Sequence, residues 1–171
     1  MVVVATDGVA GKTTYRLTYD ADPATQTNVY AMAGNADTPL SMPAAFQVAA
    51  PFGADFGGVS PDFYAFVADA EFDSWLTVGA TDSSAGGAIA ASPGFSLSAW
   101  TETNALVDAN CAVFWMVPDA SATNAVPTDG GIVLAQVTVA TGTTFTATAL
   151  LQGRANPLTV DDFQVPVSWT V

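Results

Sequence analysis

The clearest indication of the fold is a segment in which apolar and polar side chains alternate, Phe163-Gln164-Val165-Pro166-Val167-Ser168-Trp169-Thr170-Val171. Successive side chains of a β-strand point to opposite faces, so this period of two predicts a strand whose odd-numbered side chains are buried. Pro166 has no backbone N–H to donate to a neighbouring strand. It therefore predicts that the strand lies at the edge of a sheet or carries a bulge.

Alternating segments recur in the rest of the chain. In residues 13–19 the large apolar side chains of Tyr15, Leu17 and Tyr19 alternate with polar ones, which predicts another strand. Residues 132–139 and 144–152 form a matching pair, and the glycine in the connection Ala140-Thr141-Gly142-Thr143 predicts a β-hairpin between them. Shorter candidate strands cover residues 28–33, 45–49, 63–68, 74–78, 95–100 and 112–117.

These segments amount to about nine or ten strands separated by turns rich in glycine and proline. The sequence has no convincing amphipathic helix, although residues 70–76 could form a single helical turn. We therefore predict an all-β fold, an antiparallel two-layer β-sandwich that is jelly-roll-like. The length of 171 residues suits one domain over residues 1–171, which we expect to be a module of a larger or processed extracellular protein.

The charge balance excludes several classes of function. The chain has 16 acidic and three basic residues, for a net charge of −13, so electrostatic binding to nucleic acid or to an anionic membrane is not expected. It has no histidine, which removes Ser-His-Asp and Cys-His catalysis and the commonest zinc ligand. No stretch approaches the ~18 consecutive apolar residues of a membrane-spanning helix, so direct membrane insertion is not expected either.

Fourteen of the 16 acidic residues are aspartates, and most fall in predicted turns. One interpretation is that they keep a nearly neutral surface soluble. A sharper hypothesis concerns Asp69, Glu71 and Asp73, which would project to one face of an extended segment. Calcium prefers several oxygen ligands, so these three residues are candidate calcium ligands, although the EF-hand loop pattern is absent.

Aromatic residues offer another route to function. The four tryptophans could stack on sugar rings, but each lies in an apolar, strand-like context that favours packing in the core. Phe52 and Phe56 differ because they lie in a glycine-rich loop, Pro51-Phe52-Gly53-Ala54-Asp55-Phe56-Gly57-Gly58. They either plug one end of the sandwich or contact a partner or ligand.

No catalytic residue is predicted. The single cysteine, Cys111, is expected to be a small buried hydrophobic residue, since no histidine exists to activate it. Glycoside hydrolysis needs only two carboxylates, yet nothing in the sequence around Glu71 or Glu102 singles out a proton donor. We therefore expect that the protein is not an enzyme.

Four segments resemble a poorly characterised group of secreted, β-rich proteins from aquatic microbes. The segments are Glu71-Phe72-Asp73-Ser74-Trp75-Leu76-Thr77-Val78-Gly79, Val113-Phe114-Trp115-Met116-Val117-Pro118-Asp119, Val133-Leu134-Ala135-Gln136-Val137-Thr138 and Leu151-Gln152-Gly153-Arg154. The resemblance covers roughly residues 28–154. It implies an extracellular module, often part of a larger surface protein, and it assigns no catalytic residues.

Two functional hypotheses follow. The first is a non-enzymatic, extracellular structural or adhesive module of a cell-surface or appendage assembly, whose partner is another copy of the chain or a neighbouring surface module. The alternative is a carbohydrate-binding module that binds a glycan, with Ca²⁺ as its one candidate cofactor.

Overall fold

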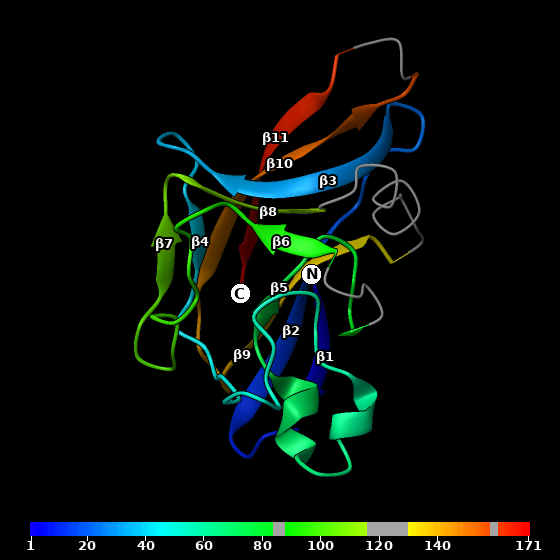
Figure 1. Ribbon diagram of the computed structural model, residues 1–171. Helices are drawn as coiled ribbons and strands as arrows, with labels where there is room; N and C mark the ends of the chain where they lie inside the picture. Colours follow the sequence, from blue (N-terminus) through cyan, green and yellow to red (C-terminus); the bar gives the residue numbers. More distant parts are fainter. Residues whose placement is uncertain (84–87, 116–129, 158–160) are drawn as a thin grey trace.

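Two antiparallel sheets pack against each other in the computed structural model, as Figure 1 shows. The structure describes residues 1–83, 88–115, 130–157 and 161–171. Within these residues, the smaller sheet has four strands in the order β1 (Val2–Thr6), β2 (Lys12–Tyr19), β9 (Ile132–Ala140) and β5 (Trp75–Leu76). The larger sheet has seven strands, β6 (Ile89–Ala91), β8 (Cys111–Trp115), β3 (Gln26–Gly34), β10 (Thr146–Ala155), β4 (Leu40–Met42), β7 (Leu106–Asp108) and β11 (Phe163–Thr170). The predicted all-β, two-layer sandwich is confirmed.

The last strand behaves as its alternation predicts. In β11 the odd-numbered side chains face the core, where Trp169 is buried, while Gln164, Pro166 and Ser168 are exposed. The strand pairs with β10 alone among the described strands, and Pro166 lies opposite Leu150. The prediction of an edge strand is therefore confirmed, because a proline in a central strand would remove a ladder hydrogen bond.

The predicted hairpin between residues 132–139 and 144–152 is wrong. The two segments form β9 and β10, but β9 pairs with β2 and β5 in the smaller sheet, whereas β10 pairs with strands of the larger sheet. The connection contains Gly142 at a φ of +86° and carries the chain across the core from one sheet to the other. A glycine turn between two apolar segments is compatible with either arrangement, because both need the chain to reverse direction.

Some strands of the larger sheet lie end to end and so occupy a single position in the strand order, which we call a row. β3 and β4 both pair with the same side of β10, at Leu150 and Thr148 respectively, so they form one row that residues 35–39 interrupt. The row formed by β8 and β7 lies beside it, with Cys111 opposite Gly34 and Asp108 opposite Leu40. Residues 35–39 therefore form an excursion between β3 and β4.

The core between the sheets contains Cys111 and three of the four tryptophans, whereas Trp75 is buried on the outer face of the smaller sheet, opposite Gln136. The tryptophans are Trp75, Trp100, Trp115 and Trp169. The indole N–H groups of the last three donate to the backbone oxygens of Pro43, Val78 and Thr18. Cys111 packs in this core, and burial raises the pKa of its thiol to about 11.

Several shorter predictions need correction. Residues 45–49 and 95–100 lie in no named strand, and residues 63–68 lie in turns and short 3₁₀ helices. The predicted strand 74–78 contracts to β5, and of the predicted strand 112–117 the structure describes β8, which ends at Trp115; residues 116 and 117 lie outside the described residues. The sequence prediction omitted β1, β4, β6 and β7, which are short or lack a clear alternation of polar and apolar residues.

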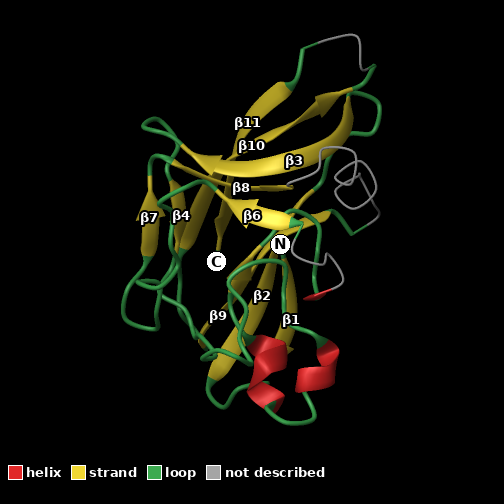
Figure 2. Ribbon diagram, in the orientation of Figure 1, coloured by secondary structure: helices red, strands yellow, loops and turns green. Residues whose placement is uncertain are grey.

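A further segment covers the outer face of the smaller sheet. Gln136 and Thr138 in β9 alternate with core residues and so face away from the core, yet both are fully buried. The covering segment includes η1 (Pro61–Phe63) and η2 (Ala68–Phe72), two 3₁₀ helices that Figure 2 shows together at one end of the molecule. Among the described residues, no helix has the length and apolar character needed to cross a membrane.

Candidate functional site

The carboxylate of Asp73 holds the covering segment together through hydrogen bonds to its backbone. The residue is only 1% exposed. Its Oδ1 atom accepts hydrogen bonds from the backbone N–H groups of Val48 (2.7 Å) and Ser74 (3.0 Å). Its Oδ2 atom accepts a third from the N–H of Ala54 (2.8 Å). One buried side chain therefore fixes both ends of the loop 48–54, since it supplies acceptors that the loop backbone would otherwise lack.

The loop 48–54 closes tightly over this carboxylate. The N–H groups of Phe52 and Gly53 both donate to the carbonyl oxygen of Ala49. A Cβ atom added to Gly53 would lie 1.9 Å from the Val48 oxygen and 3.0 Å from Asp73 Oδ2. Glycine is required at this position because any side chain would collide with the backbone across the loop.

A second set of hydrogen bonds attaches Asp73 and its neighbours to the smaller sheet. Gln136 Nε2 donates to the carbonyl oxygens of Glu71 (3.0 Å) and Asp73 (2.8 Å). The hydroxyl of Thr138 donates to the oxygen of Phe72 (2.7 Å), and its backbone N–H donates to Ser74 Oγ (3.0 Å). The two buried polar residues of β9 therefore hold the end of η2 against the sheet.

The environment of Asp73 changes its acidity. Burial raises the pKa of this carboxyl from 3.8 to about 6, and the three backbone N–H donors act in the opposite direction by favouring the ionised form. The nearby carboxylate of Asp55 adds a smaller upward contribution. The proton equilibrium of Asp73 is therefore coupled to the closure of the loop 48–54.

The structure separates the three candidate calcium ligands. Asp69 and Glu71 lie on η2 and are exposed, whereas Asp73 is buried and follows that helix. The segment is a 3₁₀ helix and not extended, so the alternation that would place all three side chains on one face does not hold. Across the described part of the chain, no three acidic or cysteine side chains come together in a group that could hold a metal ion.

The two candidate contact residues of the glycine-rich loop are both half-buried. Phe52 packs edge to face against Phe63, with ring centroids 5.7 Å apart. Phe56 packs against the core and lies 6.5 Å from Phe95. Both side chains thus contribute to packing, and Phe52 belongs to a larger aromatic group that the sequence interpretation did not identify.

Phe63, the partner of Phe52, lies on a projecting segment, residues 61–67, which we call the aromatic tip. Phe66 is 78% exposed and Phe63 is also exposed, although both are large apolar side chains. The N–H groups of Phe66 and Val67 donate to the carbonyl oxygen of Phe63, which holds the tip in a compact turn (Figure 1). The sequence Ser60-Pro61-Asp62 could have revealed this turn, because a serine N-cap followed by proline starts a helix.

A second exposed apolar element is the edge strand β1. The side chains of Val2, Val3 and Val4 are all exposed, and β1 pairs with β2 alone among the described strands. The other exposed large apolar side chains of the described residues are Met1, Phe63, Phe66 and Val107. Exposed apolar surface is thus concentrated on the aromatic tip and on β1, and these are the parts of the surface best suited to contact a partner.

Comparisons with known proteins give no family assignment: no protein-family model, no curated protein and no solved structure matches this chain. Of the segments that resemble secreted proteins of aquatic microbes, residues 71–79 include Asp73 and β5, and residues 133–138 lie in β9. Residues 116–119 of that resemblance lie outside the described residues.

Proposed function

We propose that this protein is a non-enzymatic structural or adhesive module that acts outside the cell, in a cell-surface or appendage assembly. The observation that carries the proposal is the exposure of Phe66 on a tip that is held firmly to the sandwich. An exposed phenylalanine on a flexible segment would lose much of its binding energy to ordering, whereas one on a fixed turn does not. The Asp73 and Phe63 contacts supply that fixation.

The partner that fits this surface is a second copy of the chain. The apolar strand β1 lies at the edge of the smaller sheet as the described strands form it, and its residues Val2–Thr6 carry no charged side chain. The aromatic tip is flanked by acidic residues, so contact with an uncharged strand avoids like-charge repulsion. The resemblance to secreted surface proteins supports the same setting.

Sedimentation velocity over a range of protein concentrations tests this proposal. The net charge of −13 opposes self-association, so the experiment compares about 0.1 M with about 1 M NaCl, where the Debye length falls from ~10 Å to ~3 Å. We expect concentration-dependent oligomers that are favoured by salt and that Phe66→Ser removes. The matched control is Val107→Ser, because Val107 is 65% exposed on β7 and does not belong to the tip.

Because the side chain of Phe66 is largely exposed, serine at this position should leave the melting midpoint unchanged. A wild-type protein that stays monomeric under all these conditions would contradict the proposal. So would a Phe66→Ser variant that associates as well as wild type.

The alternative function is binding of a glycan. It is favoured by a pocket on the outer face of the larger sheet whose polar side chains are all uncharged. Assistance by Ca²⁺ at Asp69, Glu71 and Asp73 is the form of this alternative with the least support, because the Asp73 carboxylate already accepts three backbone hydrogen bonds.

A further inference from the structure

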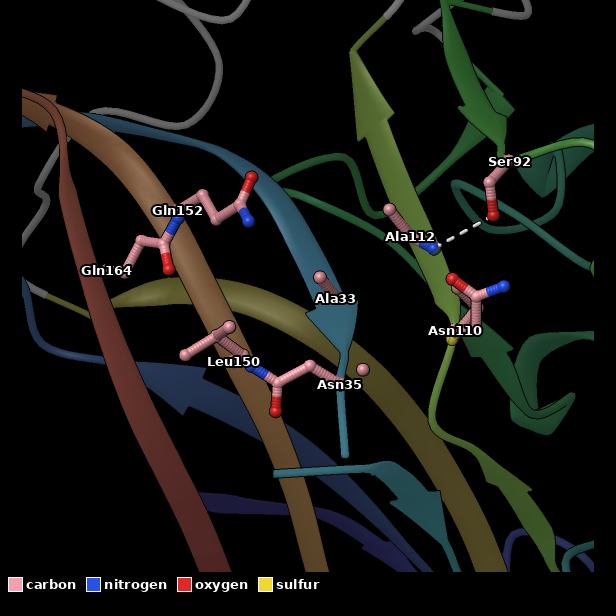
Figure 3. A pocket seen from close by; sticks show the side chains of 10 residues that line it. Ala33, Asn35, Ser92, Asn110, Ala112, Leu150, Gln152 and Gln164 are labelled. Atoms are coloured by element: carbon pink, nitrogen blue, oxygen red, sulfur yellow. Dashed lines mark hydrogen bonds between the residues drawn. The ribbon is translucent and has the colours of Figure 1, made fainter. Parts of the chain in front are cut away.

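The pocket on the larger sheet has a volume of about 330 Å³ and lies where β11, β10, β3 and β8 run side by side (Figure 3). In these strands Val165, Leu151, Met32 and Val113 point into the core. The residues between them, including Ala33 and Ala112, therefore face away from the core and form the floor of the pocket. The small side chains of this floor let a ligand approach the sheet closely.

The walls of the pocket carry neutral polar groups. Figure 3 shows Gln152 and Gln164 on one side of Ala33 and Ala112, and Ser92 and Asn110 on the other, with Asn35 at one end. Gln152 and Gln164 lie directly opposite each other in the pairing of β10 with β11.

Most of these groups are not used within the fold. The side-chain amides of Gln152, Gln164 and Asn110 make no hydrogen bond to any described residue. Ser92 Oγ accepts the N–H of Ala112 (3.0 Å), and Asn35 Oδ1 accepts the N–H groups of two following residues, which leaves the Asn35 NH₂ group as a donor. Each amide offers both donors and acceptors.

A second pocket of about 400 Å³ adjoins the first along β10 and β11. Leu150 lines the first pocket, and its partner across the strands, Pro166, lines the second. From Gln152 to Thr148 the outer face extends about 14 Å at ~3.4 Å per residue. The excursion 35–39 lines both pockets, with Asn35 in the first and Asp37, Thr38 and Pro39 in the second. Together the two pockets form an elongated trough that suits a chain better than a single ring.

The trough has an aromatic neighbour on the same face. Gln152 lies opposite Ala31, and Ala31 lies opposite Phe114, so the three side chains form one row across the sheet. Phe114 is half-buried. An aromatic ring beside amide groups combines an apolar surface for a sugar ring with hydrogen-bonding groups for its hydroxyls.

We propose that this trough binds a neutral carbohydrate chain. Sugar hydroxyls both donate and accept hydrogen bonds, as the glutamine and asparagine amides do. Asp37 in the second pocket is the one charged side chain among the described residues that line the trough, and Arg154, the exposed cation that follows Gln152 on β10, is not among them. The net charge of −13 also repels anionic polysaccharides, which selects for neutral ones.

A glycan array that carries neutral and anionic oligosaccharides, followed by NMR titration of each neutral hit, tests this site. We expect binding to neutral chains and none to uronate or sulfated chains of equal length. The NMR shifts should fall on the backbone amides of Ala33, Ala112 and Gln152. The double variant Gln152→Ala, Gln164→Ala should weaken binding about tenfold, since it removes hydrogen bonds to the sugar.

The matched control is Thr146→Ala, an exposed position on β10 outside the trough. An array without a neutral hit, a preference for anionic chains, or affinity unchanged in the double glutamine variant would each overturn the proposal. Phe66→Ser should leave glycan binding intact, and the double glutamine variant should leave self-association intact. The two variants therefore test the glycan site and self-association independently of each other.

Discussion

The Asp73 carboxylate and the backbone N–H of Val48 lie 2.7 Å apart in space and 25 residues apart in the sequence. With the bonds from Ala54 and Ser74, this contact turns a loop without regular structure into a fixed support for the aromatic tip. A buried carboxylate that accepts three backbone hydrogen bonds stabilises the loop, because each N–H donor would otherwise be unpaired.

Replacing Asp73 by alanine should lower the free energy of unfolding by about 1–3 kcal/mol for each N–H that stays buried without an acceptor. Hydrogen exchange at Val48 and Ala54 should become much faster than in wild type. Urea unfolding and exchange measured by NMR check both effects. Asp55→Ala, at an exposed neighbouring position, is the control, and equal losses in the two variants would refute the role of Asp73.

Asp73 should also make stability depend on pH. Because its pKa is about 6 in the folded protein against 3.8 ordinarily, the folded state binds the proton more tightly than the unfolded state. The stabilisation by this proton is complete below about pH 3.8 and is lost as the pH rises through about 6, up to about 3 kcal/mol in all.

Urea unfolding at several pH values from about 4 to about 7 tests this dependence. In Asp73→Asn the loss of stability over this range should disappear, whereas the exposed Asp62→Asn should keep it. If Asp73→Asn retains the full dependence on pH, another group is responsible.

Gly53→Ala should destabilise the protein by about 1–3 kcal/mol, the usual cost of adding atoms to a tightly packed site. The added Cβ would meet the Val48 carbonyl and the Asp73 carboxylate. Gly130→Ala is the matched control, since nothing lies within 4 Å of a Cβ at that position. Thermal melting of both variants gives the comparison, and similar midpoints would show that the loop 48–54 does not close as described.

The strands that the sequence predicted correctly share one physical property. β2 and β11 each have one face in the core and one outside it, so burial imposes a period of two on Tyr15, Leu17 and Trp169. The edge position of β11 was also predictable, because proline restricts pairing wherever it occurs.

Other features depend on contacts that no local pattern contains. The turn at Gly142 can join paired strands or cross between sheets, and only the pairing partners of β9 and β10 decide between these arrangements. The burial of Gln136 and Thr138 on an outer face arises because a distant segment covers them.

The same limit applies to the candidate site. Asp69, Glu71 and Asp73 look equivalent in the sequence, but the loop 48–54 packs over Asp73 alone. The exposure of the Phe66 side chain likewise depends on the fixed turn at Phe63, and no described residue covers it. Phe52 and Phe56 were the better candidates from the sequence only because glycines surround them.

Calcium should leave the stability of the protein unchanged. Asp73 is bonded to three backbone N–H groups, so Asp69 and Glu71 remain as exposed carboxylates without a buried third ligand. Thermal melting in EDTA and in excess CaCl₂ tests this expectation. A midpoint that rises with calcium in wild type but not in Glu71→Gln would restore the calcium site.

The most direct measurement of the proposed function places a photo-reactive p-benzoylphenylalanine at position 66 and irradiates the protein at high concentration and high salt. We expect covalent dimers whose cross-linked peptides join the aromatic tip of one copy to the surface of another, and no comparable product from the same label at Val107. Cross-links that form only within one copy, or equal yields from both positions, would contradict the proposal that Phe66 mediates assembly.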